Sequence, residues 1–323
     1  MIRVIAFKVR KDEEAIFDKY ADIHGFELVK RKEDLNHESV NECKGFDAVI
    51  IQASCIVDES VVKQLKESSC KVLVTRAIGY NNIDIKACRK HQLAVANVTY
   101  SSASVAEFTV MLILMSLRKM KKTATNLLNN QPSFVNLKGR ELKDLCVGII
   151  GYGSMGKAVV DILKGFNCEV IVYNRSEIND VNIKQVSLSQ LYERADIVSL
   201  HIPLNEKTNH FISEDEFAQM KDGVVLINTA RGGLVKTEAL VKNLNNGKLS
   251  ACGLDVFEDE LQTFRDFKAN KNNYFSQLQA MDNVILSPHM AFFTEGVTDD
   301  CIRIAFENIN QFSKGLVPDF SLL

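Results

Sequence analysis

A glycine-rich turn is the first segment whose residue types and spacing could perform chemistry. Gly151, Gly153 and Gly156 follow the pattern Gly-x-Gly-x-x-Gly, after an apolar strand pattern and before a helical pattern, Ser154–Gly165. A second strand pattern, Glu169–Tyr173, ends about 20 residues further on, which is the context that a dinucleotide-binding fold requires. Gly151 permits the tight turn, Gly153 lets backbone approach a pyrophosphate, and Gly156 allows close packing of helix on strand. Since free N–H groups at a helix N-terminus favour anions, the turn predicts a site for the phosphates of a dinucleotide.

The residues after the second strand bear on which nicotinamide cofactor binds. Asn174 stands where NAD-binding proteins usually have Asp or Glu to hold the ribose hydroxyls. An amide does not repel a 2′-phosphate, and Arg175 and Ser176 could bind one, so the segment favours NADP(H) slightly over NAD(H). In the alternative interpretation, Arg175 is a solvated loop residue and Asn174 is an adequate partner for the ribose.

Further strand ends carry groups suited to a small organic acid. Arg231 offers a planar guanidinium that can hold a carboxylate with two hydrogen bonds. His289 can exchange a proton near neutral pH, and its acidic partner must come from Glu258 or Glu260. Each group also has an explanation that involves no ligand. Arg231 could form a surface ion pair, His289 could be a structural histidine, and the acidic residues could lie in a solvated loop.

Strand-like and helix-like segments alternate along the chain, and the continuously apolar strands indicate parallel sheets covered on both faces. A long helical pattern, Ser101–Lys121, separates two α/β sets. The last helical pattern, Thr294–Ser313, has no strand of its own and could pack on the first set. We therefore predict a discontinuous domain of residues 1–98 plus 290–323 and a second domain of residues 99–289. The cleft between them would be the natural ligand site.

Composition excludes several classes of protein. The chain has 323 residues and a mass of 36.2 kDa, about two domains, with ordinary hydrophobic (46%) and charged (25%) fractions. Its net charge of −2 supplies no basic surface for nucleic acid or anionic lipid. The longest apolar run, Phe108–Leu117, is shorter than the ~18 residues that a spanning helix needs, and Ile2–Val9, broken by Arg3 and Lys8, does not resemble a signal peptide. We expect a cytoplasmic protein with no nucleic-acid or membrane partner.

The cysteines indicate neither a metal nor a redox site. Eight cysteines lie far apart, with no Cys-x-x-Cys pair. Zinc sites and redox motifs usually need such close pairs, so we expect no metal. Several cysteines lie inside apolar runs and are predicted to be buried, reduced thiols.

The motifs resemble those of the D-isomer specific 2-hydroxyacid dehydrogenase family over nearly the whole chain. Beside the glycine turn, the resemblance rests on stretches that occur in the family's order: Thr75–Asp84, Tyr100–Glu107, Asn228–Gly233, Leu254–Glu258 and Ser287–Thr294. The residues after His289, Ala291–Glu295, are similar to the D-lactate dehydrogenase branch, including the vancomycin-resistance type. Lys138–Lys143, before the nucleotide strand, adds to this similarity.

The resemblance implies two Rossmann-like, doubly wound parallel-sheet domains, a flavodoxin-like substrate domain and an NAD(P)-binding Rossmann domain, with a cleft between them. It implies hydride transfer that reduces a 2-keto acid to the D-2-hydroxy acid, and a homodimer paired through the region of Ala106–Leu117. Phe292 and Phe293 favour an apolar substrate such as pyruvate or a larger 2-keto acid. A D-2-hydroxyglutarate dehydrogenase, or another D-2-hydroxyacid dehydrogenase of the family, is an alternative; a dicarboxylate would need a second cation, for which Arg76 is a candidate. A corepressor-like protein that senses dinucleotides is the alternative of a different class.

Carried over by position, the resemblance assigns roles to individual residues. Arg231 would hold the substrate carboxylate, His289 would donate the proton, and Glu260 would be its acidic partner. The implied substrate contacts are Tyr100, Ile78, Gly79, Arg231 and Phe292. The implied cofactor-binding residues are Gly151, Gly153, Ser154, Met155, Gly156, Asn174, Arg175, Ser176, His201, Ile202, Pro203, Thr208, Thr229, Ala230, Arg231, Asp255 and His289.

Two residues depart from the family's pattern. Ser102 stands where proline is frequent, which bears on the geometry beside Tyr100. Asn174 stands where aspartate is frequent, which bears on the cofactor and not on the reaction.

Overall fold

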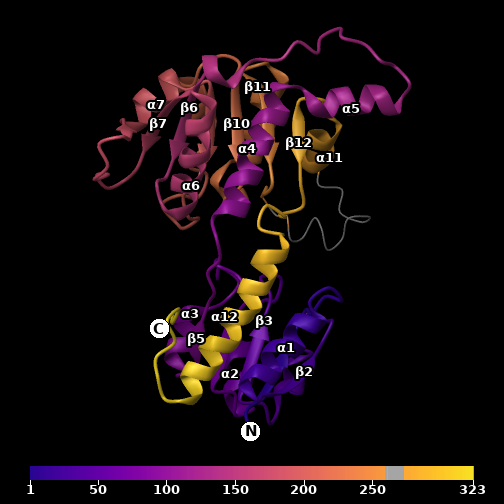
Figure 1. Cartoon of the computed structure of the whole chain (residues 1–323), viewed down its shortest axis with the longest axis vertical. Helices are drawn as coiled ribbons and strands as arrows, with labels where there is room; N and C mark the ends of the chain where they lie inside the picture. The colour runs from indigo at the N-terminus through magenta and orange to yellow at the C-terminus, as the bar shows by residue number, and fades with distance from the viewer. Residues whose placement is uncertain (259, 261–272, 323) are drawn as a thin grey trace. The chain divides into compact units, whose positions relative to one another are not determined.

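The computed structural model describes residues 1–258, 260 and 273–322. The chain divides into two compact units (Figure 1). Unit 1 consists of Met1–Ser101 and Phe293–Leu323, and unit 2 of Ser102–Phe292. The predicted domain boundaries, 98/99 and 289/290, each lie three residues before the boundaries of these units.

Unit 1 contains a parallel five-stranded sheet. The strands are β1 (Arg3–Ala6), β2 (Glu27–Lys30), β3 (Ala48–Ile51), β4 (Val72–Thr75) and β5 (Ala94–Ala96). Their order, β2-β1-β3-β4-β5, is that of flavodoxin-like doubly wound sheets. In such sheets, ligands bind beside the carboxyl ends of the strands, so the loops after β1, β3 and β4 are the ones of interest.

Helices cover both faces of the unit 1 sheet. They are α1 (Glu14–His24), α2 (Glu59–Glu67), α3 (Ile85–Lys90) and α12 (Glu295–Ser313), with a 3-10 turn at Val40–Cys43. Val49 and Leu73 of the strands pack with Leu65 of α2. α1 and α12 lie side by side, with the ring centroids of Phe17 and Phe306 5.9 Å apart. The C-terminal helix is therefore part of the core around the N-terminal sheet.

Unit 2 contains a seven-stranded sheet in which every neighbouring pair is parallel. The strands are β6 (Cys146–Ile150), β7 (Glu169–Tyr173), β8 (Lys184–Gln185), β9 (Ile197–Leu200), β10 (Val224–Asn228), β11 (Leu249–Leu254) and β12 (Val284–Leu286). Counted from β6, the order β12-β11-β10-β9-β6-β7-β8 is the Rossmann order with one further strand. The direction of winding changes between β6 and β9, which is where such sheets bind dinucleotides.

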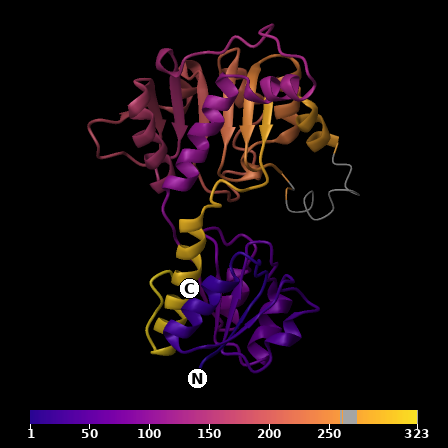
Figure 2. The ribbon, with the colours of Figure 1, turned by 45° about the vertical axis from the view of Figure 1, so that its right-hand side comes forward.

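Both faces of the unit 2 sheet are buried, which explains why its central strands are apolar at nearly every position. The helices that the structure describes here are α4 (Ala103–Leu117), α5 (Met120–Leu128), α6 (Ser154–Leu163), α7 (Leu188–Arg194), α8 (Glu214–Gln219), α9 (Thr237–Asn245) and α11 (Asn273–Ala280). Val147 and Ile149 of β6 pack with α4 and α6, whereas Cys146 and Ile150 pack with residues of α7 and α9. Figure 2 shows α4 lying across one face of this sheet.

Some predicted elements differ from those observed. The helical pattern Ser101–Lys121 divides into α4 and α5 because Lys119 adopts a left-handed conformation, with φ 52°. An α-helix of L-residues does not continue through this conformation. The edge strands β2 and β8 were not predicted from the sequence, since their residues are mostly polar and none of them is buried.

The two parallel sheets with helices on their faces confirm the predicted α/β fold class. All eight cysteines are unpaired, and all but Cys168 are buried. Burial raises the pKa of Cys146 to about 11, so this thiol stays protonated near neutral pH. Within the described residues, no helix is both long and apolar enough to cross a membrane.

Candidate active site

The glycine turn lies between β6 and α6, at the carboxyl edge of the unit 2 sheet. Gly151 has φ 99°, and a Cβ there would lie 2.6 Å from the carbonyl oxygen of His201 and 2.8 Å from Cγ2 of Ile202. A Cβ on Gly156 would lie 2.0 Å from the carbonyl oxygen of Gly151. Neither position can carry a side chain unless the backbone moves.

The middle glycine and the start of α6 form an open anion site. Apart from its chain neighbours, no atom lies within 4 Å of a Cβ built on Gly153. The N–H groups of Ser154, Met155 and Gly156 donate to no described residue, as is usual in the first turn of a helix. Open space beside free N–H donors fits a pyrophosphate group.

Asn174 directly follows β7 and is hydrogen-bonded to the glycine turn. Its Oδ1 accepts the N–H of Tyr152 at 3.1 Å, and its Nδ2 donates to the carbonyl and hydroxyl oxygens of Ser176, both at 3.1 Å. Arg175 is exposed, and its side chain has no hydrogen-bond or ion-pair partner among the described residues. The segment therefore presents a free cation beside an amide that is already engaged.

His201, directly after β9, is a neutral histidine near pH 7. Burial lowers its pKa to about 4. Its Nε2 lies 2.9 Å from the hydroxyl oxygen of Ser199, so the ring has a hydrogen-bond partner in the preceding strand. A ring that stays unprotonated at neutral pH is unsuited to donate the proton of a reduction.

Two threonines support the neighbouring loops. Thr208 Oγ1 donates to the carbonyl oxygen of Pro203 at 2.6 Å and closes the turn after β9. Thr229, directly after β10, is buried, and its Oγ1 lies 2.8 Å from Oγ1 of Thr109 in α4. Both contacts fix backbone at the same carboxyl edge as the glycine turn.

Arg231 follows β10 and is half-buried. Its Nη1 donates to the carbonyl oxygen of Ala230 at 2.6 Å, and its own carbonyl oxygen accepts from Nδ2 of Asn228 at 2.9 Å. No carboxylate of the described residues pairs with its guanidinium, whose remaining donors are unoccupied by those residues. A half-buried arginine without an anionic partner suits a carboxylate ligand.

His289 and Glu260 form an ion pair in the same unit. Nδ1 of His289 lies 2.6 Å from Oε1 of Glu260, whose Oε2 accepts the N–H of Phe257 at 3.2 Å. The His289 side chain is 37% exposed and that of Glu260 is 14% exposed, so the ring is reachable while its partner is enclosed. With Nδ1 donating to the carboxylate, Nε2 is the atom left to face a ligand. The ring of Phe292 meets the imidazole edge-on, with centroids 6.2 Å apart.

Glu258, the other acid that residue type left open, contacts a different histidine. Its Oε1 lies 2.5 Å from Nε2 of His210, and its Oε2 accepts the N–H of Thr237 at 2.6 Å. Burial raises the pKa of Glu258, but the hydrogen bonds from Thr237 and His210 outweigh this effect and the net shift is downward. The loop around Glu258 also touches the loop of Arg231, because a Cβ on Gly232 would lie 2.0 Å from the carbonyl oxygen of Phe257.

Asp255 holds the backbone that carries His289. His289 has φ 53°, a left-handed conformation that costs about 1–3 kcal/mol in a residue with a side chain. The N–H of His289 donates to the carbonyl oxygen of Asp255 at 2.8 Å. The buried Asp255 carboxylate accepts from Ser287 Oγ at 2.7 Å and from the N–H groups of Met290 and Ala291, both at 2.9 Å. The side chain of Asp255 thus faces the His289 loop. The family resemblance implied a contact of Asp255 with the cofactor and did not indicate this role.

We expect Asp255→Asn to lower the free energy of unfolding by about 1–3 kcal/mol, because an amide nitrogen would replace an oxygen that now accepts from a buried N–H. Ser287→Ala removes a single donor and should cost about 1 kcal/mol. Urea denaturation followed by circular dichroism measures both. An Asp255→Asn protein as stable as the wild type would contradict this assignment of contacts.

The substrate residues implied for unit 1 lie at the carboxyl edge of its own sheet. The N–H groups of Ile78 and Gly79, in the loop after β4, donate to no described residue. The carbonyl oxygen of Ile78 accepts from Nδ2 of Asn97 at 2.8 Å. This hydrogen bond fixes the loop while both N–H groups stay available to a ligand. Tyr100 is half-buried near the end of the first segment of the unit.

The signals for these contacts differ. Ser287 and Asp255 stood in the quoted motifs, but nothing local indicated that they bond to each other. Glu13, which forms a buried ion pair with Arg76 in unit 1, lies in no motif. Among the described residues, no group of three or more His, Cys, Asp or Glu side chains is placed to hold a metal ion.

Comparisons with known proteins give the family of the chain. The family model described as "D-isomer specific 2-hydroxyacid dehydrogenase, NAD binding domain" matches residues 110–291. A D-specific alpha-keto acid dehydrogenase of Enterococcus faecium is 40% identical over 261 residues, 80% of each chain. An aromatic 2-oxoacid reductase of Clostridium sporogenes is 32% identical over 318 residues, 96% of each chain. The solved structure of D-2-hydroxyisocaproate dehydrogenase matches with a TM-score of 0.90 and 30% identity, over 99% of both chains.

These similarities extend over both units and include the glycine turn, Arg231, Glu260 and His289 within the matched ranges. The glycine turn fits the phosphates of NAD, and the family model is that of an NAD-binding domain. The chain therefore belongs to the D-isomer specific 2-hydroxyacid dehydrogenase family and is an NAD-dependent oxidoreductase.

Proposed function

We propose that the protein reduces a 2-keto acid to the D-2-hydroxy acid. The observation that carries the proposal is the pair of groups in unit 2: an arginine that has no anionic partner among the described residues, and a histidine whose Nδ1 is held by a carboxylate. Arg231, Glu260 and His289 follow β10, β11 and β12, which are neighbours in a parallel sheet, so they lie along the same edge. This combination suits an acid whose neighbouring carbonyl must gain a proton.

In the proposed reaction, each group acts on a stated atom. The nicotinamide cofactor supplies the hydride when it is bound. Arg231 holds the carboxylate and polarises the adjacent carbonyl. Protonated His289 donates a hydrogen bond from Nε2 to the carbonyl oxygen and delivers the proton, a role that typically contributes ~10²–10⁴-fold. Glu260 fixes the ring through Nδ1, and its negative charge favours the imidazolium.

The proposed substrate is pyruvate or a larger apolar 2-keto acid. A dicarboxylate such as 2-oxoglutarate would need a second cation, and Arg76 is buried in an ion pair with Glu13, at 2.7 Å. A paired interior cation is a poor partner for a second substrate carboxylate, because leaving Glu13 buried and unpaired is costly. The ring of Phe292 beside His289 supports an apolar side chain. The name of the Clostridium sporogenes relative, an aromatic 2-oxoacid reductase, agrees with such a substrate class.

At the 2′ position of the cofactor, we propose a slight preference for NADP(H) over NAD(H). Asn174 carries no charge to repel a 2′-phosphate, and Arg175 is exposed and has no partner among the described residues. A phosphate beside this guanidinium would gain a charge-assisted hydrogen bond.

Steady-state assays with a panel of keto acids test these proposals. We expect pyruvate, 4-methyl-2-oxopentanoate and phenylpyruvate to be reduced, with kcat/KM at least about tenfold above that for 2-oxoglutarate, since each missing charge pair costs about 1.4 kcal/mol or more. Chiral chromatography should show the D product. Higher kcat/KM with NADH than with NADPH would contradict the cofactor preference alone, and no turnover of any acid would contradict the reaction.

We also propose a homodimer formed through an apolar surface of unit 2, built by α4, α5 and residues 132–139. This surface has a groove of about 930 Å³ lined by Val110, Leu114, Leu127 and Phe134. The side chains of Leu128 and Phe134 are 83% and 97% exposed. Apolar surface of this kind on one face of a soluble protein is typical of an interface, and a second copy of the chain is the proposed partner.

The double variant Leu127→Asp/Phe134→Asp is expected to be monomeric, because two carboxylates would be buried without partners at the interface. Light scattering coupled to gel filtration should show the mass of two chains for the wild type and of one for the variant. Ile23→Asp, on an exposed position of α1, is the matched control and should remain dimeric. A monomeric wild type would contradict the proposal.

A cytoplasmic location is the remaining proposal. The unpaired cysteines, most of them buried, support a reducing compartment.

A further inference from the structure

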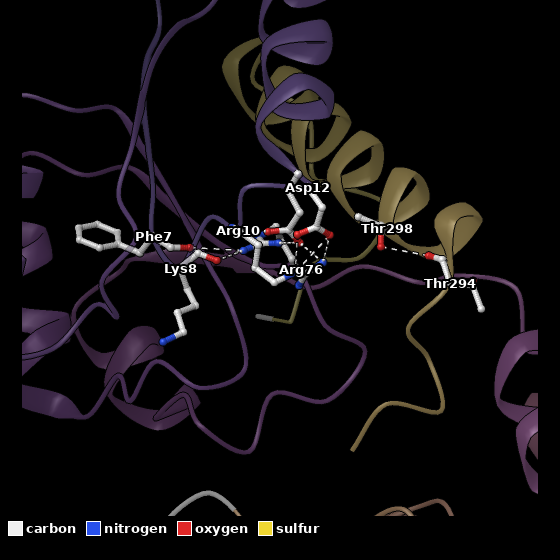
Figure 3. Close-up of polar contacts among 8 residues, drawn as sticks. Phe7, Lys8, Arg10, Asp12, Arg76, Thr294 and Thr298 are labelled. Atoms are coloured by element: carbon white, nitrogen blue, oxygen red, sulfur yellow. Dashed lines mark hydrogen bonds and ion pairs between the residues drawn. The ribbon is translucent and has the colours of Figure 1, made fainter. Parts of the chain in front are cut away.

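Arg76 lies directly before the loop Ala77–Gly79 and joins it to a distant loop. Its side chain is 2% exposed, and its backbone N–H donates to the carbonyl oxygen of Ile51 at 2.9 Å. Its Nη2 donates to the carbonyl oxygen of Lys8 at 3.0 Å and contacts that of Phe7 at 3.4 Å, as Figure 3 shows. One guanidinium thus links the loop after β4 with the loop after β1.

Glu13 completes this connection. Its Oε1 accepts from Nη1 of Arg76 at 2.7 Å and lies 2.9 Å from Nη2 of Arg10, and its Oε2 accepts the N–H of Arg10 at 3.0 Å. The Glu13 side chain is also 2% exposed. The guanidinium of Arg10 stacks over the ring of Phe293, 4.7 Å from its centroid, and Phe293 is the residue at which the chain returns to unit 1. The buried acid therefore fixes the loop after β1 as well as Arg76.

The pair is poorly explained by stability alone. Burial lowers the pKa of Arg76, and the charge of Glu13 opposes that effect. Desolvation offsets most of the attraction in a buried ion pair, so apolar residues of similar volume often serve stability as well. In addition, Nε of Arg76 is buried with no acceptor among the described residues. What the pair supplies is fixed geometry between two loops at the carboxyl edge of the sheet.

That geometry bears on the two free backbone donors of the loop. Arg76 holds its start, and Asn97 holds the carbonyl oxygen of Ile78 from the other side. Asn97 is itself held, because its carbonyl oxygen accepts from Nδ2 of the buried Asn308 at 2.8 Å. A loop clamped at both ends keeps the N–H groups of Ile78 and Gly79 in one direction, as a carboxylate-binding pair of donors requires.

We propose that Glu13 and Arg76 are positioning residues, which hold the loop after β4 so that the N–H groups of Ile78 and Gly79 bind the carboxylate of the keto acid. The inference rests on the proposed function. Neither side chain touches the substrate; both act through the backbone of the loop.

Glu13→Gln tests this role, since it keeps the size of the side chain and removes its charge. We expect the KM for the preferred keto acid to rise about 10–100-fold. This is the change in affinity expected when a hydrogen bond to a charged group, here the substrate carboxylate, is lost. The Kd for NADH, measured by fluorescence titration, should stay within about twofold, because the cofactor residues are in unit 2. A merely structural role would lower the thermal midpoint and the active fraction, and would leave the KM of the folded enzyme unchanged.

Two further variants sharpen the test. Arg76→Lys keeps the charge and loses the planar fork, so it should raise KM as well. Glu27→Gln removes an exposed ion pair with Arg3 in the same sheet and should leave KM unchanged. A wild-type KM in Glu13→Gln would overturn the proposal; should that variant not fold, Glu13→Asp decides in the same way, a raised KM supporting the role and an unchanged KM overturning it. A wild type that reduces no keto acid would contradict the proposed function instead.

Discussion

Replacing His289 by glutamine is expected to remove most turnover and to leave cofactor binding intact. Glutamine can still donate a hydrogen bond to the carbonyl oxygen and to Glu260, but it cannot deliver a proton. The loss of a general acid lowers kcat by about 10²–10⁴-fold. The new residue adds little strain, since His289 itself already occupies a left-handed conformation. The decrease in kcat is measured from NAD(P)H absorbance, and the Kd for the cofactor by fluorescence titration.

A matched histidine variant separates this effect from a general one. His37 pairs with Asp58 at an exposed position in unit 1, and His37→Gln should keep the wild-type kcat. Full activity in His289→Gln would remove the proposed acid. A large loss of cofactor affinity in the same variant would mean that His289 shapes the cofactor site and does not act mainly as the acid.

Arg231→Lys is expected to weaken the binding of the keto acid far more than it slows the bound complex. Lysine keeps the positive charge but has a single ammonium group in place of the planar fork, so the two parallel hydrogen bonds to a carboxylate are lost. We expect KM for the keto acid to rise about 10–100-fold, as for the loss of a charge-assisted hydrogen bond. Initial rates over a range of keto-acid concentrations at saturating cofactor give this value.

The control for the arginine variant lies in the same unit. Arg194 of α7 pairs with Glu169 at an exposed position, and Arg194→Lys should leave KM and kcat unchanged. If Arg231→Lys bound the keto acid as tightly as the wild type, the carboxylate would have another principal partner and the proposed role of Arg231 would be wrong.

The parts of the site that could be predicted from the sequence are those set by local rules. In a parallel α/β chain, the residues that follow each strand lie at the carboxyl edge, so Arg231 and His289 could be placed there from the strand pattern alone. The glycine turn could be predicted because each glycine has a local steric reason, which the contacts of Gly151 and Gly156 bear out. The break at Lys119 could not be predicted, because a left-handed lysine leaves no mark in the apolar periodicity.

The sequence by itself therefore determined the fold class, the family and the edge of the sheet at which the chemistry would be found. Residue type alone left Glu258 and Glu260 open as partners of His289, and the family resemblance pointed to Glu260, which contacts His289 in the structure. Only the tertiary structure decided that Glu258 pairs with His210 and that Asp255 turns toward the His289 loop. It also decided that Arg76, which the sequence left as a candidate second cation for a dicarboxylate substrate, is bound to an acid 63 residues away. The physical reason is the same in each case: a hydrogen bond depends on the distance between two side chains, and chain spacing does not record that distance once loops from several strands fold over one edge.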